Sequence, residues 1–158
     1  MPHRPVEAIA LLERLIAQSK TPVKLLGSSL GGFYATYLAE RHGLKAVQVN
    51  PCVHCDEKLA DEVGKPQKNW HSGEHYEFSA RHLAELQALK VARPSRPERY
   101  LLLVETGDEV LDYREAVAYF RGARQVVLEG GDHGFSRFAE YIPIILDFYR
   151  EERKEREK

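Results

Sequence analysis

The residues with the clearest chemical potential lie in a Gly-Ser-Ser-Leu-Gly stretch near the N-terminus. Gly27, Ser29 and Gly31 form the pattern G-x-S-x-G, between a short apolar run and a segment with helical periodicity. A serine on such a tight turn projects its hydroxyl above a sheet edge, and a glycine on each side is expected to give the turn room. The Leu30 N–H, at the start of the helix, is the expected first donor to an oxyanion. The pattern predicts a serine nucleophile, and a Gly/Ser-rich turn without chemistry is the alternative.

An acid and a base follow further along the chain. Asp108 comes after an apolar run in Thr-Gly-Asp-Glu-Val, and His133 stands in Gly-Gly-Asp-His-Gly-Phe after another such run. The order Ser, Asp, His is that of α/β-hydrolases. In this scheme His133 takes the Ser29 proton and later gives it to the leaving group. Asp108 fixes the tautomer of His133, and Ser29 carries the acyl group.

Other carboxylates compete for the role of the acid. Glu109 and Asp112 lie close to Asp108 in the sequence. Asp112 is better explained as the N-cap of the next helix, with Glu115 at the third helical position. Asp132 directly precedes the base, where it is expected to tune the site or to cap the main chain.

The elements that must position these residues alternate between strand and helix. A strand, a helix and a strand in succession indicate a βαβ unit and a mostly parallel sheet. We therefore expect an α/β protein of three layers, with about four strands flanked by helices, in a single domain over residues 1–158. Helices are predicted at 6–17, 32–39, 78–89, 113–120 and 138–149, and strands at 23–26, 45–49, 100–104 and 125–128.

The middle and the end of the chain are less regular. Residues 52–76 are polar and broken by glycine and proline, so no sustained element is expected there. Together with the helix that follows, residues 52–90 are expected to form a small cap over the carboxyl end of the sheet. A proline-rich linker is predicted at 93–99. Residues 150–158 are predicted to be a charged, solvated tail.

Composition limits the classes of partner. The chain has 158 residues, a net charge of −1 and two cysteines. A nearly balanced charge argues against nucleic acid or an anionic membrane as a partner. No apolar run approaches the ~20 residues of a membrane span, and the N-terminus has no apolar leader. We therefore expect a cytoplasmic protein.

The motifs resemble those of the YqiA/YcfP family of small α/β-hydrolase esterases. The similar stretches are G-S-S-L-G-G-F-Y-A-T-Y-L-A, V-N-P, S-A-R-H-L, E-T-G-D-E-V-L-D-Y-R-E-A-V-A-Y and E-G-G-D-H-G-F, which together span about residues 6–148. The resemblance implies a serine esterase that cleaves small acyl esters or thioesters and needs no cofactor or metal. It places the nucleophile at Ser29, the acid at Asp108 and the base at His133.

The chain departs from the family pattern at its front. The resemblance implies an N-terminal strand and an H-G-F-type loop, which supplies a second oxyanion donor, ahead of the first helix. Such a segment is not seen before that helix, so we expect an N-terminally truncated fold with the nucleophile strand at a sheet edge. An oxyanion hole with one hydrogen-bond donor fewer is expected to lower kcat by a factor of about 10²–10³. We expect a chain that is weakly active, unstable, or a homodimer through that edge.

Two further sets of residues lie in the irregular region. Trp70, Tyr76 and Phe78 are predicted to line an apolar pocket for the acyl group, with a packing role as the alternative. A Cys-x2-Cys pair (Cys52 and Cys55) and a His-x3-His pair (His71 and His75) fit the loose spacing of a zinc site. Glycine and proline near the histidines weaken that interpretation. The rival hypothesis for the whole chain is a non-catalytic remnant with a structural or interaction role, with or without this zinc.

Overall fold

The computed structural model describes residues 1–69 and 72–156. The chain divides into two compact units. One unit combines Met1–Val23 with His54–Ala92, and the other combines Lys24–Val53 with Arg93–Lys158. The segment expected to form a cap, residues 52–90, therefore belongs to the first unit from His54 onward, and that unit also includes the N-terminal helix.

The second unit is built on a four-stranded parallel sheet in the order β1-β2-β5-β6. All six residues of β2 and of β5 are buried, because these are the two central strands. β1 lies at the edge, and its Leu26 side chain is 47% exposed. The strands are β1 (Leu25–Ser29), β2 (Ala46–Pro51), β5 (Tyr100–Glu105) and β6 (Arg124–Leu128).

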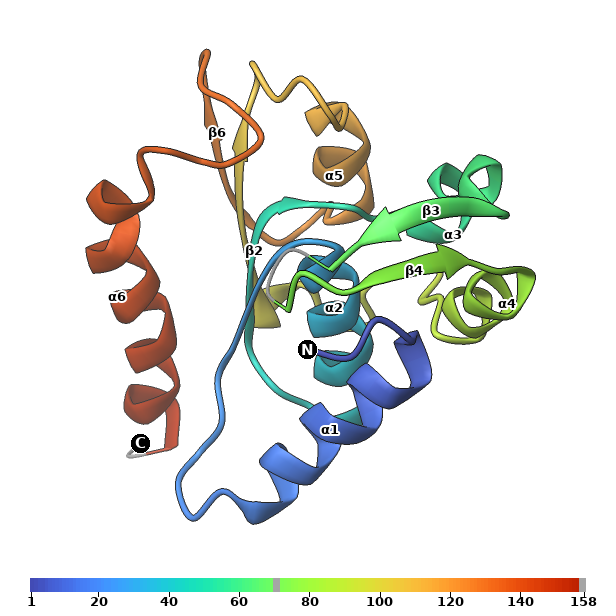
Figure 1. The fold of residues 1–158 in the computed structure, drawn as a ribbon. Helices are drawn as coiled ribbons and strands as arrows, with labels where there is room; N and C mark the ends of the chain where they lie inside the picture. The colour runs from blue at the N-terminus through green and yellow to red at the C-terminus, as the bar shows by residue number, and fades with distance from the viewer. Residues whose placement is uncertain (70–71, 157–158) are drawn as a thin grey trace. The chain divides into compact units, whose positions relative to one another are not determined.

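Helices cover both faces of this sheet, as Figure 1 shows. Alternate residues of each strand point to opposite faces, so the central strands contribute side chains to two separate apolar clusters, one on each face of the sheet. Leu102 and Val104 of β5 pack with α2 and α5 on one face, and Leu101 and Leu103 pack with α6 on the other. The helices of this unit are α2 (Leu30–His42), α5 (Tyr113–Tyr119) and α6 (Phe138–Arg156), with a short 3₁₀ turn η2 at Pro97–Arg99. The expected three-layer α/β architecture is confirmed.

The first predicted strand needs a correction. The apolar run at 23–26 was expected to be a buried strand followed by a turn around Ser29. The strand instead runs from Leu25 to Ser29, and α2 begins at the next residue. It is only partly buried, because it pairs with β2 alone among the described residues.

The first unit holds a β-hairpin that the sequence did not predict. β3 (Lys65–Lys68) and β4 (His75–Phe78) pair antiparallel, although residues 52–76 were expected to be irregular. The strands are four residues each, and β3 is mostly exposed, contains Pro66 and shows no apolar alternation. β4 does alternate polar and apolar residues, with Phe78 buried, but the prediction assigned Phe78 to the helix at 78–89 and so missed the strand. The unit's other elements are α1 (Pro5–Gln18), α3 (Cys55–Lys58), the 3₁₀ turn η1 (Ala60–Glu62) and α4 (Ala80–Ala88).

Side-chain contacts tie α1 to α4 within this unit. Glu85 of α4 accepts hydrogen bonds from Arg4 Nη2 (2.6 Å) and from the Val6 N–H (3.2 Å) at the start of α1. None of the described helices is both long enough and apolar enough to cross a bilayer.

Candidate active site

Ser29 occupies a strained position where β1 passes into α2. Its φ of 52° and ψ of −123° lie in a region that non-glycine residues rarely adopt. Such a conformation persists only where the surrounding structure holds it, which is typical of functional turns. The sequence pattern therefore lies directly at the passage from a strand to a helix, the context expected for a nucleophile serine.

The glycines around Ser29 differ in how closely they are packed. A Cβ at Gly27 would overlap the Gly31 carbonyl group, and a Cβ at Gly32 would lie 2.6 Å from the Cβ of Pro51. A Cβ at Gly31 meets nothing within 4 Å. The expectation of close packing at Gly27 and Gly31 is therefore right for the first and wrong for the second, where Gly32 takes its place.

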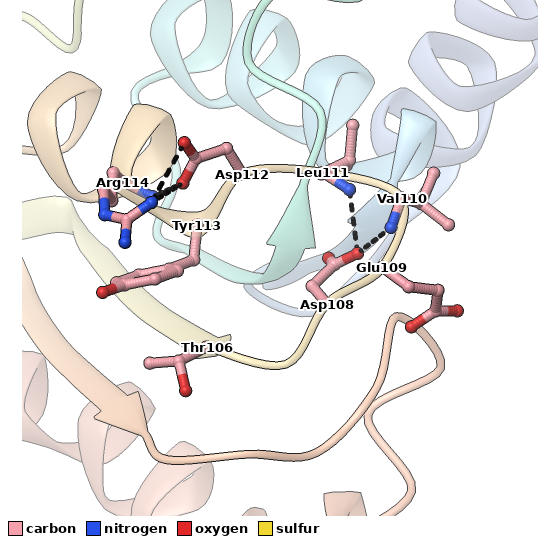
Figure 2. Close-up of a pocket in the computed structure, with 8 residues that line it drawn as sticks. All are labelled: Thr106, Asp108, Glu109, Val110, Leu111, Asp112, Tyr113 and Arg114. Atoms are coloured by element: carbon pink, nitrogen blue, oxygen red, sulfur yellow. Dashed lines mark hydrogen bonds and ion pairs between the residues drawn. The ribbon is translucent and has the colours of Figure 1, made fainter.

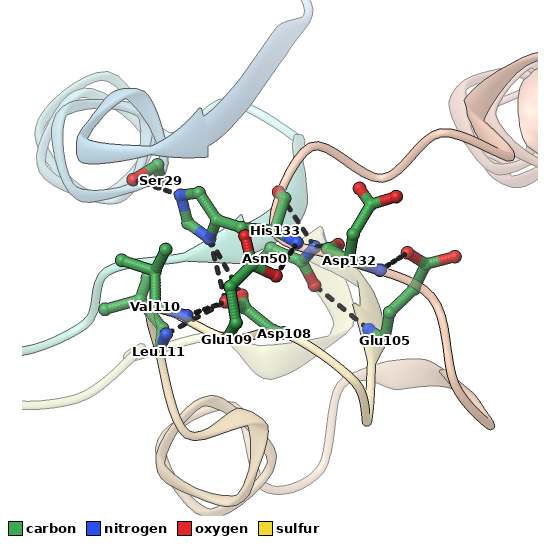
Figure 3. Close-up of polar contacts among 9 residues, drawn as sticks. All are labelled: Ser29, Asn50, Glu105, Asp108, Glu109, Val110, Leu111, Asp132 and His133. Carbon is green, nitrogen blue, oxygen red and sulfur yellow. Dashed lines mark hydrogen bonds and ion pairs between the residues drawn. The ribbon is translucent and has the colours of Figure 1, made fainter.

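The structure brings the three predicted residues together at the carboxyl ends of three strands. His133 Nε2 lies 3.1 Å from Ser29 Oγ, and His133 Nδ1 lies 2.9 Å from Asp108 Oδ2 (Figure 3). A carboxylate can only accept, so it favours the tautomer with the proton on Nδ1. Nε2 is then the acceptor for the Ser29 hydroxyl. This is the geometry of a nucleophile, a base and an orienting acid.

Burial distinguishes Asp108 from the carboxylates that competed with it. The Asp108 side chain is 2% exposed, and its Oδ1 accepts the N–H groups of Val110 (2.8 Å) and Leu111 (2.9 Å). Asp112 accepts the Arg114 N–H (3.0 Å) and so caps α5, as the sequence predicted. Glu109 accepts the main-chain N–H of His133 (3.0 Å) rather than facing the ring.

Leu30 begins α2, so its main-chain N–H lies at a helix N-terminus next to Ser29. The first N–H groups of a helix have no intrahelical acceptor and carry the positive end of the dipole. This placement fits the predicted oxyanion role of Leu30, which remains a prediction.

A set of buried polar residues around the loop of His133 was not anticipated as functional. Asn50 and Glu105 are 2% and 0% exposed, and both bond to the main chain around His133. The only feature of the sequence that could have identified them is that each is a polar residue at the end of a mostly apolar strand. That signal marks the carboxyl edge of a parallel sheet, where sites collect.

A cavity of about 280 Å³ lies beside Asp108 (Figure 2). It is lined by Thr106 and residues 108–114, from the loop that follows β5 and from the first turn of α5. Its lining includes Asp108 but neither Ser29 nor His133. The cavity therefore belongs to the loop around Asp108 and does not include the contact between Ser29 and His133.

The predicted acyl-pocket residues lie in the other unit or outside the description. Tyr76 and Phe78 are on β4, and Trp70 lies outside the described residues. The Tyr76 ring stacks on His3 with centroids 4.4 Å apart, and the Phe78 ring stacks on His82 at 5.4 Å. These contacts fit the packing role that was the alternative, and the substrate role remains a prediction.

The predicted zinc ligands do not form a cluster in the described part of the chain. Among those residues no group of three or more His, Cys, Asp or Glu side chains is placed to hold a metal ion. His71 lies outside the described residues, while Cys55 begins α3 and His75 begins β4.

Comparison with known sequences assigns the family. A sequence model of the Uncharacterised protein family (UPF0227) matches residues 1–150. The chain belongs to the UPF0227 family. This confirms the resemblance to YqiA-type esterases that the motifs indicated. A UPF0227 protein of Shewanella loihica is 31% identical over 58 residues, which are 36% of this chain and 32% of that protein.

Solved structures show the fold of this UPF0227 chain to be that of α/β hydrolases. The esterase domain of a Rhodothermus marinus protein superposes with a TM-score of 0.63 at 22% identity, over 93% of this chain and 68% of that one. Est1E from Butyrivibrio proteoclasticus superposes with a TM-score of 0.70 at 14% identity, over 93% of this chain and 71% of Est1E. Mouse alpha/beta hydrolase domain-containing protein 10 superposes with a TM-score of 0.69 at 14% identity, over 94% of this chain and 70% of the mouse protein.

Proposed function

We propose that this UPF0227 chain is a serine esterase that cleaves small acyl esters or thioesters through an acyl-enzyme. The observation that carries the proposal is the continuous line of contacts from Ser29 Oγ to His133 Nε2 (3.1 Å) and from His133 Nδ1 to Asp108 (2.9 Å). The structural neighbour from Rhodothermus marinus is an esterase domain, which supports the substrate class.

The reaction follows from this geometry in two halves. His133 Nε2 takes the Ser29 proton as Oγ attacks the acyl carbon, and the negative charge moves to the carbonyl oxygen, near the Leu30 N–H. The tetrahedral intermediate collapses when His133 protonates the departing alcohol or thiol, which leaves the acyl group on Ser29. Water then attacks the acyl-enzyme, with His133 as the base, and releases the acid. Asp108 stabilises the imidazolium formed in each half.

A fluorophosphonate reagent tests the proposal without knowledge of the substrate. It reacts with an activated serine, so intact mass should show one adduct on the chain and none on Ser29→Ala. Ser28→Ala is the matched control, because Ser28 is the adjacent serine of the same strand. It should label like the unaltered chain.

Hydrolysis of p-nitrophenyl esters of increasing acyl length should follow the same pattern among the three proteins. A folded chain that neither labels nor hydrolyses any ester in the series would exclude the esterase and favour the structural or interaction role.

A further inference from the structure

The main chain at His133 is held from both sides by side chains of other segments. The His133 N–H donates to Glu109 Oε2 (3.0 Å), and its carbonyl accepts from Asn50 Nδ2 (3.1 Å). The preceding Asp132 carbonyl accepts from the same Nδ2 (2.9 Å), and the Asp132 N–H donates to Glu105 Oε2 (2.8 Å). We call Asn50, Glu105 and Glu109 the His133 clamp (Figure 3).

Asn50 uses its whole side-chain amide in this arrangement. It lies near the end of β2, and its φ of 39° is a left-handed value that asparagine tolerates better than most residues. Its Oδ1 accepts the Glu105 N–H (3.0 Å), which ties it to β5. Both Nδ2 protons then serve the two carbonyls at Asp132 and His133, so one buried side chain joins the sheet to the loop of the base.

Glu105 is a fully buried carboxylate in contact with the loop of His133. Its Oε1 accepts from Arg137 Nε (2.7 Å), and this bond raises the pKa of the Arg137 guanidinium above its ordinary value. A Cβ at Gly131 would overlap the Glu105 carboxyl group, so the main chain reaches the carboxylate only because that residue is glycine. A buried charge costs free energy unless it is paired and hydrogen-bonded, and here it is both.

The loop of His133 is rich in glycine, so contacts from other segments are needed to fix its conformation. Gly130 and Gly131 precede Asp132 with φ of 71° and 78°, and Gly134 follows His133. Glycines leave a main chain conformationally free, so they do not fix the direction of the imidazole by themselves. An error of about 1 Å in the position of a reacting group can cost about 10²-fold in rate.

We infer that Asn50 is a positioning residue for the proposed reaction, and that with Glu105 and Glu109 it fixes the His133 ring between Ser29 and Asp108. The inference deepens the proposed function and rests on it for its catalytic consequence. The geometric part, that the clamp holds the ring, has its own readout.

The decisive variant is Asn50→Asp. Aspartate has the same shape, tolerates the left-handed φ, and can still accept the Glu105 N–H. It presents an acceptor instead of two donors to the carbonyls of Asp132 and His133. The matched control is Gln125→Glu, since Gln125 Nε2 also donates to two main-chain carbonyls, those of Val117 (3.1 Å) and Phe120 (2.9 Å), away from the site.

Two measurements are made on each protein. The first is the rate constant of fluorophosphonate labelling, which we expect to fall about 10–100-fold in Asn50→Asp and to stay within about twofold in Gln125→Glu. The second is the NMR signal of the His133 Nδ1–H proton, assigned by its loss in His133→Gln. We expect this signal to disappear or broaden in Asn50→Asp only.

A second pair of variants covers the case in which Asn50→Asp does not fold. Glu109 is exposed, so its replacement does not threaten the core. Glu109→Met removes the acceptor for the His133 N–H and should slow labelling several-fold, whereas Glu109→Gln keeps an acceptor oxygen and should restore it.

The outcomes separate the two proposals. If Asn50→Asp keeps both the labelling rate and the Nδ1–H signal, or if the control loses them equally, the positioning role is overturned. If the unaltered chain does not label but its Nδ1–H signal is present and is lost only in Asn50→Asp, the clamp stands and the esterase proposal fails.

Discussion

Asp108 serves two partners at once, the imidazole of His133 and the main chain of its own loop. Its Oδ1 accepts the N–H groups of Val110 and Leu111, while both carboxylate oxygens lie within 3.0 Å of His133 Nδ1. The loop bonds hold the side chain in one orientation, and in the proposed reaction that orientation directs the carboxylate to the ring of His133.

Replacing Asp108 by asparagine should separate these two roles. Asparagine Oδ1 can still accept from Val110 and Leu111, but its amide favours the wrong tautomer of His133. We expect ester hydrolysis to fall about 10³–10⁴-fold with the fold retained. Hydrolysis rates and urea unfolding of both proteins provide the measurement. Activity within tenfold of the unaltered chain would show that Asp108 is not the acid.

Sequence reasoning identified the residues with reactive groups but not those that hold them. Ser29, Asp108 and His133 were found because each has a chemical type and a place after a strand that together suggest a role. Asn50 and Glu105 have no such signal, because their importance lies in contacts with the Asp132 and His133 main chain. The conformation of a glycine-rich loop decides those contacts, and the sequence does not specify that conformation.

Among the elements, the long apolar ones were predictable and the short polar ones were not. β5 is a nearly continuous apolar run, and β2 is mostly apolar with Gln48 buried in its middle. Gly43 follows α2 with a left-handed φ of 65°, a common way for a helix to end. In the hairpin of β3 and β4, the mostly exposed β3 shows no apolar periodicity, and the alternation of β4 spans only four residues, the last of which, Phe78, was assigned to the next helix.

The turn between β1 and α2 allows a direct test of packing. Gly27→Ala should destabilise the chain by about 1–3 kcal/mol, because its Cβ overlaps the main chain of the next turn. Gly31→Ala has open space within a helix and should stabilise by about 0.5–1 kcal/mol. Urea unfolding of the two variants gives the comparison, and equal effects would contradict the packing seen at this turn.

The start of α4 should make stability depend on pH. His82 Nδ1 accepts the Ser79 N–H (3.0 Å), an interaction that needs the neutral ring. Burial, and next the nearby His3, lower the pKa of His82 below its ordinary 6.5. Below pH 6.5 the unfolded chain therefore binds the proton more readily, so this contribution to stability is complete above pH 6.5 and is lost as the pH falls from there to the lowered pKa.

Urea unfolding at pH 7.5 and pH 5 measures this effect. His82→Gln should show a smaller loss between the two pH values, since glutamine at the third helical position can accept the same N–H without titrating. An equal pH dependence in both proteins would assign the effect to other groups.

At the scale of the whole molecule, the sheet has two strands at its edges. β1 and β6 each pair with one neighbour among the described residues, and Leu26 and Val127 on them are 47% and 45% exposed. An edge strand can pair with another chain. The sequence placed the nucleophile strand at an edge, and the described sheet agrees with that placement.

We predict that the chain self-associates through β1. Leu26→Lys should shift the protein toward the monomer in sedimentation, because a charge on an edge strand opposes pairing. Val127→Lys makes the same change on the other edge and should leave the association unchanged. A monomer at all concentrations, or an equal effect of both substitutions, would refute this prediction.

The strand order also sets the moment in synthesis at which the site is complete. β2 pairs with β5 only after residues 52–105 have been made, and β6 and the loop of His133 come later still. Chains fold from the N-terminus as the ribosome releases them. Ser29 is therefore synthesised first, the proposed acid Asp108 later, and the proposed base His133 last. A nascent chain that stalls before residue 133 has the proposed nucleophile but no means to activate it.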